Sequence, residues 1–266
     1  MTLVRNPAVA GTFYESDPAI LSNDVQGYLN AVENVAATPP KAIIVPHAGY
    51  IYSAPIAAKA YTMLKPSKDI IKRVVVLGPC HRVGIAGMAL TSADIYQTPL
   101  GAIKVDHSFD KTLLALPGVQ VFDDTHIPEH SLEVQLPFLQ IVITDFDFIP
   151  IVVGGNDAEH IARVLDAVWG DTETLIVISS DLSHYLNYTQ AQTSDRATCL
   201  AIEQLDAKSI MDTQACGRFP IQGLLTCAKR RAMTVKTLDL RNSGDTAGSK
   251  DKVVGYGAWA FWEPQP

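Results

Sequence analysis

Short runs of apolar and β-branched residues recur along the chain, and each run ends in polar or glycine-rich residues. Four of them cover residues 42–45, 74–77, 148–153 and 175–178. They lack the polar alternation of a half-exposed strand, so they predict strands buried on both faces of a mainly parallel sheet. A later run, residues 253–261, predicts a further strand within or beside that sheet.

Segments with helical character separate these strands. An alanine-rich segment covers residues 53–64, and residues 131–141 open with Ser131 as a helix N-cap. Three further predicted helices cover residues 158–169, 190–205 and 221–231.

The alternation of strands and helices is typical of an α/β protein. Residues 89–121 are the exception, because they have the pattern of a hairpin or excursion from the sheet. No repeat, linker or shift in composition divides the chain. We therefore expect one domain over residues 1–266, with a central, mainly parallel mixed sheet flanked by helices.

Composition and charge narrow the classes of function. Hydrophobic residues make up 47% of the 266 residues and charged residues 18%, which is typical of a globular protein. A net charge of −7 without a Lys/Arg cluster argues against nucleic-acid and anionic-membrane partners. The chain has no run of 18 apolar residues, no signal-peptide layout at its start and no CxxC pair among its four cysteines. These features favour a cytoplasmic protein.

Histidines and an aspartate follow several of the predicted strands. His47 follows the first strand, His81 the second, and Asp181 and His184 the fourth. Ligands of open α/β sheets bind outside the carboxyl ends of the strands, so we expect these side chains to converge. Imidazoles with a carboxylate suit a mononuclear Fe(II) centre, and also zinc or copper. The alternative is that each histidine is structural and that Asp181 only caps a helix.

A second cluster of histidines and glutamates lies just before and within the predicted helix at residues 131–141. His130 and Glu133 are three residues apart, so they can share one face of the first turn. There they would bind substrate or form hydrogen bonds to a metal ligand. The alternative for Glu133 is that it is an ordinary charged residue in the first turn of the helix. Tyr50 flanks the first histidine and either offers its hydroxyl to the site or packs in the core.

Six blocks of the sequence resemble the Memo family, which is also called AmmeMemoRadiSam system protein B in bacteria and archaea. The blocks occur in the family's order and span nearly the whole chain: residues 7–14, 46–50, 78–81, 129–138, 179–185 and 216–221. Each block alone is only modestly specific for the family, whereas six blocks in the same order make the resemblance strong. The resemblance implies a fold similar to that of the class III extradiol dioxygenases (LigB-like), which are non-haem Fe(II) enzymes.

The resemblance also implies a set of site residues. In the family, the positions that match His47, His81, Asp181 and His184 line a pocket for which iron or copper binding has been proposed. A cysteine completes this pocket in animal members, and the stretch that we match to it, residues 242–248, contains none. Asp245 lies closest by position, so we expect it to join the two histidines as metal ligand, with Asp181 or Glu133 as the alternative acid. A carboxylate there would favour Fe(II) over Cu(I).

Two classes of function follow from these residues. The first is a metal-dependent, dioxygenase-like oxidoreductase with His184 as general acid or base and Asp181 orienting it. Its cofactor would be Fe(II), or else copper or zinc. The second is a non-catalytic protein that binds a peptide or small molecule and acts with the AMMECR-type and radical-SAM partners implied by the family. In both cases we expect the bound molecule to contact His130, Glu133, Tyr50 and Cys216.

Overall fold

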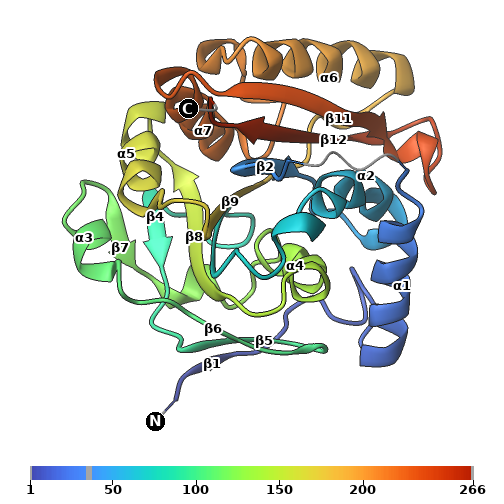
Figure 1. The fold of residues 1–266 in the computed structure, drawn as a ribbon. Coiled ribbons are helices and arrows are strands. Elements are labelled where there is room, and N and C mark those ends of the chain that lie inside the picture. Colours follow the sequence, from blue (N-terminus) through green and yellow to red (C-terminus); the bar gives the residue numbers. More distant parts are fainter. Residues whose placement is uncertain (1, 34–37, 265–266) are drawn as a thin grey trace.

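Four parallel strands form the centre of the fold in a computed structural model that describes residues 2–33 and 38–264 (Figure 1). Each consists mainly of apolar residues, and these are almost all buried, as expected for strands covered on both faces. All four strands predicted from the apolar runs are confirmed. In spatial order they are β2 (Ala42–Val45), β9 (Thr174–Ser179), β3 (Arg73–Pro79) and β8 (Asp147–Gly155).

Antiparallel pairs flank this parallel centre and complete a nine-stranded sheet. β12 (Val253–Trp262) pairs with β2, which confirms the late strand and places it inside the sheet. β12 also pairs with β11 (Thr234–Asn242) and β10 (His184–Leu186). On the other side, β4 (Gly87–Leu90) is antiparallel to β8 and parallel to β7 (Val119–Val121). The sheet is thus mixed, as predicted, with four neighbouring parallel strands at its centre.

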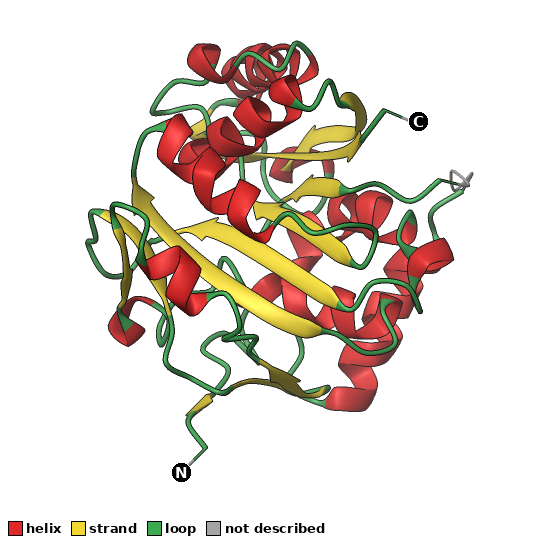
Figure 2. Ribbon diagram, turned by 60° about the vertical axis from the view of Figure 1, so that its left-hand side comes forward, coloured by secondary structure: helices red, strands yellow, loops and turns green. Residues whose placement is uncertain are grey.

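Helices cover both faces of the sheet (Figure 2). Alternate residues of the central strands point into two cores: Ile43 and Val45 contribute to one, whereas Ala42 and Ile44 contribute to the other. The first core is closed by α1 (Pro18–Asn30), α2 (Tyr50–Thr62) and α4 (Leu136–Val142). The second is closed by α5 (Ala158–Val168), α6 (Tyr188–Glu203) and α7 (Arg218–Arg230). These layers confirm the predicted α/β class.

Among the smaller elements, the hairpin expected within residues 89–121 is present, whereas the helix expected over 131–141 begins later. The excursion within 89–121 contains the hairpin of β5 (Ile95–Thr98) and β6 (Gly101–Lys104), which pairs with β1 (Val4–Arg5) in a three-stranded sheet, and also α3 (Asp110–Leu114). The helix predicted over 131–141 begins as a 3-10 turn at Glu133–Gln135 and becomes α-helical only at Leu136. Pro137 suits that start, since proline is tolerated in the first turn of a helix. Other 3-10 turns are Lys65–Ser67, Asp123–Thr125, Ala207–Ser209 and Ser243–Asp245.

The parallel centre determines where a site can form. β2, β3 and β9 end at Val45, Pro79 and Ser179, and their parallel pairing brings these ends to one edge of the sheet. Val45 lies directly opposite Ser179. The loops after these strands therefore meet. Among the described residues, no helix is both long and apolar enough to span a bilayer.

Candidate metal centre

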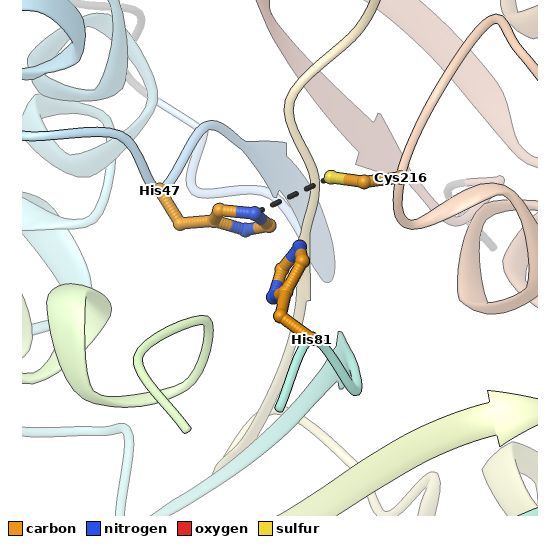
Figure 3. A group of neighbouring side chains, drawn as sticks. All are labelled: His47, His81 and Cys216. Carbon is orange, nitrogen blue, oxygen red and sulfur yellow. Dashed lines mark hydrogen bonds between the residues drawn. The ribbon is translucent and has the colours of Figure 1, made fainter. Parts of the chain in front are cut away.

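Two histidines and a cysteine meet at the carboxyl edge of the central strands (Figure 3). His47 follows β2, His81 follows β3, and Cys216 lies two residues before α7. One ligand atom from each of the three lies within 4.8 Å of the other two. The Nε2 atom of His47 is 3.3 Å from the Sγ atom of Cys216, and the two imidazole centroids are 5.2 Å apart. The strand ends thus bring His47 and His81 together, as their positions in the sequence led us to expect.

Cys216 rather than Asp245 completes this group. The carboxylate of Asp245 accepts the backbone N–H of Asn242 at 3.0 Å and the hydroxyl of Tyr188, and it closes a capping box on the 3-10 turn Ser243–Asp245. Because these local contacts occupy Asp245, the structure does not bring it to the histidines. This corrects the assignment of Asp245 as a metal ligand. The third side chain of the group is therefore a thiol and not the carboxylate that we expected.

Hydrogen bonds determine which nitrogen of His47 faces the cysteine. Nδ1 of His47 is 2.8 Å from the Oγ atom of Ser179, whose hydroxyl donates to the carbonyl of Ser131 at 2.6 Å. Ser179 has only one proton to donate, so it accepts the Nδ1–H of His47. Burial, reinforced by the nearby charge of His81, holds the pKa of His47 well below its usual value. The ring is therefore neutral, and its Nε2 lone pair points toward Cys216.

Glu129 fixes His81 in the same tautomer. Its buried carboxylate accepts the backbone N–H of His81 at 2.6 Å and lies 2.9 Å from Nδ1 of that ring. The backbone N–H groups of His130 and Ser131 also donate to it, at 3.0 and 2.9 Å. Burial alone would raise the pKa of Glu129, but the hydrogen bonds and charge of His81 lower it to about 2. An ionised carboxylate accepts only, so in the neutral His81 ring the proton lies on Nδ1 and the lone pair on Nε2.

His130 lies against both histidines without belonging to the His47–His81–Cys216 group. Its ring stacks on His81 with centroids 4.6 Å apart, and it meets the ring of His47 edge-on at 5.4 Å. Burial lowers the pKa of His130 to about 4. A second group of possible ligands, His81 with Glu129 and His130, uses the carboxylate that already supports His81. We interpret that group as support for His81 rather than as a separate metal site.

Asp181 and His184 border the group. Asp181 accepts the backbone N–H of His47 at 2.8 Å through Oδ1, and its Oδ2 lies 4.0 Å from Nε2 of His47. Burial raises the pKa of Asp181. His184 is exposed, and its Nδ1 lies 2.8 Å from the carbonyl of Leu182, so Nε2 is left free. Asp181 therefore orients His47, and a backbone carbonyl takes the role toward His184 that we had expected of Asp181.

The side chains of Glu133 and Tyr50 are buried and form hydrogen bonds or an ion pair with other groups of the protein. The fully buried carboxylate of Glu133 pairs with Arg5 and also accepts the hydroxyl of Tyr14. Tyr50 donates its hydroxyl to the carbonyl of Val134 at 2.8 Å. These intramolecular partners give no support to the contact with a bound molecule that we predicted for both residues, and that contact stays a prediction. Glu133 instead anchors the N-terminal segment, and Tyr50 anchors α2.

Glu129 and Ser179 are the supporting residues that the sequence analysis missed. Glu129 stands beside His130 at the start of a block that we had singled out. Ser179 is the last residue of β9 and pairs with Val45, and Val45 precedes His47 by two residues. The parallel alignment of strand ends was the available signal for Ser179, because it places neighbouring strand ends side by side.

Comparison with known proteins identifies the family. A family model described as "Memo-like protein" matches residues 5–260. The chain belongs to the Memo family. The resemblance noted in the sequence blocks is thereby confirmed over nearly the whole chain.

Relatives and a solved structure agree with this family and fold. A MEMO1 family protein of Aquifex aeolicus is 37% identical over 264 residues, covering 95% of this chain and 97% of that protein. One from Metallosphaera sedula is 34% identical over 281 residues, covering 97% and 99%. A crystal structure of an uncharacterized protein from Escherichia coli K12 superposes with a TM-score of 0.51 at 14% identity, covering 81% of this chain and 98% of that one. At that identity, the likeness extends to the fold alone.

Proposed function

We propose that this Memo-family protein binds one transition-metal ion through Nε2 of His47, Nε2 of His81 and Sγ of Cys216. The observation that carries the proposal is the shared tautomer of the two histidines. Separate acceptors, Ser179 and Glu129, hold the Nδ1–H groups and leave both Nε2 lone pairs free beside the thiol. Metal-binding histidines typically donate their other N–H to such a partner.

The donor set limits which metals fit. Imidazole suits zinc, copper and iron, and a thiolate adds affinity for copper(I) and zinc. The preference for iron in the sequence analysis depended on a carboxylate ligand at Asp245. With Cys216 in the group, that preference needs a carboxylate from another residue. Asp181 supplies a carboxylate instead, because its Oδ2 lies 4.0 Å from Nε2 of His47. Two donors with bonds of about 2.0–2.2 Å to one ion are roughly 3–4 Å apart. We therefore propose iron, with Asp181 as a fourth donor, and treat copper and zinc as the alternatives.

The residues around the donors suit an oxidoreductase. Bound iron would supply redox chemistry at the coordination positions that the protein donors leave open. Histidine is the commonest general acid or base, and His184 is exposed with its Nδ1 at the Leu182 carbonyl and its Nε2 free to hold or transfer a proton. His130, stacked on His81, would contact the substrate beside the donors.

Metal analysis of the untagged protein tests the proposal. After anaerobic purification, we expect about one equivalent of iron in the wild type. We expect the same amount in the control variant His160→Ala, because the wild-type His160 ring lies beside Asp157 on the surface. We expect almost no iron in the His47→Ala/His81→Ala double variant. Copper or zinc in place of iron would keep the site and change the metal. A wild type that holds no more metal than the double variant at micromolar supply would refute the proposal and favour a non-catalytic binding protein.

Two further measurements divide the proposal into parts. Asp181→Asn should weaken iron binding, whereas Asp245→Asn should leave it unchanged, because Asp245 is engaged by Tyr188 and Asn242. Oxygen uptake by the iron-loaded protein with a panel of catechols tests dioxygenase-like chemistry. Absence of turnover with every catechol would refute that reaction class.

A further inference from the structure

We infer that Ser179 and Gln135 are positioning residues that hold His47 in its metal-binding tautomer. The inference deepens the proposed function and rests on it, since it concerns the donor atom that His47 would offer. Ser179 contacts His47 only from the side opposite the cysteine, through Nδ1. Gln135 contacts Ser179 rather than the ring.

The hydroxyl of Ser179 has a full set of hydrogen bonds. Its Oγ atom lies 2.6 Å from the carbonyl oxygen of Ser131, 2.8 Å from Nε2 of Gln135 and 2.8 Å from Nδ1 of His47. The Ser131 carbonyl can only accept, so it takes the single hydroxyl proton. The two lone pairs of Oγ must then accept from the other two partners. A proton on Nδ1 of His47 is the one arrangement that satisfies all three contacts.

Gln135 is itself fixed in one orientation. Its Nε2 donates to the carbonyl of Pro46 at 2.9 Å as well as to Ser179, and its Oε1 accepts the hydroxyl of Tyr61 at 2.8 Å. The Pro46 carbonyl is an acceptor only, so the amide cannot turn over without placing oxygen against oxygen. The side chains of Tyr61, Gln135 and Ser179 are completely buried, so water does not compete for these bonds.

The direction of these bonds decides what His47 can do. Were the proton on Nε2, that N–H would face the thiol of Cys216 at 3.3 Å and Asp181 at 4.0 Å. The donor atom of His47 would then be blocked by its own proton. With Ser179 as acceptor, the proton stays on the far side of the ring, and Nε2 is free in the metal-free protein.

One segment of the chain supports both histidines. The carbonyl of Ser131 orients Ser179 behind His47, while the backbone N–H of Ser131 helps to hold Glu129 behind His81. Gln135 ends the 3-10 turn that follows. Residues 129–135 thus determine the tautomers of His47 and His81 through contacts on the Nδ1 side of each ring.

Nitrogen NMR of the metal-free protein tests the inference directly. In a ¹⁵N-labelled sample, the His47 signals are assigned by their loss in His47→Gln. We expect a protonated Nδ1 and a bare Nε2 in the wild type. Ser179→Ala removes the acceptor, so the proton should move to Nε2, and the affinity for added Zn²⁺ should fall about 10–100-fold. Gln135→Leu should allow a mixture of both tautomers.

A matched variant separates positioning from general destabilisation. Ser67→Ala also deletes a buried serine hydroxyl, which donates to the carbonyl of Leu64 just before the 3-10 turn Lys65–Ser67, and it should leave the His47 tautomer unchanged. A wild type with the proton on Nε2 would overturn the inference, and this result needs no variant to fold. So would a Ser179→Ala protein that keeps Nδ1–H and full affinity. A wild type with Nδ1–H that binds no metal would refute the proposed function and leave the positioning role standing.

Discussion

Replacing Glu129 by glutamine measures what one buried carboxylate contributes to this site. The pKa of Glu129 is about 2, against an ordinary value of 4.5, so the carboxylate form is favoured in the folded state. A difference of about 2.5 units corresponds to about 3 kcal/mol of folding free energy. Glutamine keeps one acceptor oxygen but turns an NH₂ group toward the N–H donors that surround this side chain. We expect Glu129→Gln to lose about 3 kcal/mol at pH 7.

The pH dependence of the Glu129→Gln effect has a definite sign. The folded-state pKa lies below the unfolded one, so the carboxylate stabilises the fold fully above about pH 4.5 and loses this effect as the pH falls toward 2. Urea unfolding of the metal-free wild type and variant should therefore give curves that differ most at pH 7 and converge in acid. In a thermal scan, the difference corresponds to roughly 5–10 °C.

A control and a refuting result make the Glu129→Gln test sharp. Glu15→Gln removes an exposed carboxylate and should change the unfolding free energy by less than about 0.5 kcal/mol. A Glu129→Gln effect below about 1 kcal/mol, or one equally large at pH 3 and pH 7, would refute the reasoning. The same variant leaves the Nδ1–H of His81 without its anion, so its metal affinity should fall about 10–100-fold.

Three further predictions follow from other buried groups. Burial raises the pKa of Asp195 to about 6, so Asp195→Asn should raise the urea-unfolding free energy at pH 7 by up to about 3 kcal/mol. That gain should vanish between about pH 6 and pH 4, and a pH-independent gain would contradict it. Arg5→Met leaves Glu133 buried without its cation and should lower the free energy of unfolding, measured in a thermal scan, by about 3–5 kcal/mol. Cys216→Ser should abolish the thiolate-to-metal absorption band of the Co²⁺-loaded protein, whereas Cys80→Ser should retain it, because the Cys80 thiol donates to the Val83 carbonyl.

The fold was predictable where burial was uniform. The central strands are apolar on both faces, so their runs stand out in the sequence and all four are present in the structure. β11 was missed because its residues are mostly half-buried and alternate with polar ones, so no continuous apolar run marks it. The direction of β12 was not predictable, because a buried antiparallel strand has the same apolar composition as a parallel one.

The site was predictable only where strand ends determine it. His47 and His81 follow neighbouring parallel ladders, so topology alone brings them to one edge of the sheet. Cys216 precedes a helix and lies 169 residues from His47, and no local pattern reveals which loop reaches that edge. Matching by position therefore selected Asp245 instead. The roles of Ser179 and Gln135 depend on the direction of individual hydrogen bonds, which a sequence does not display.

The placement of β2 has a consequence for how the chain is made. Both neighbours of this strand, β9 and β12, are synthesised long after it, and the backbone N–H of Lys41 finds its partner only at Phe261. A nascent chain on the ribosome thus carries an apolar strand with two open edges until β9 is made and with one open edge until β12 is made, a state prone to aggregation. We expect chains released before β12 to need a chaperone to remain in solution, and His47, just beyond β2, to reach its final place only at the end of folding.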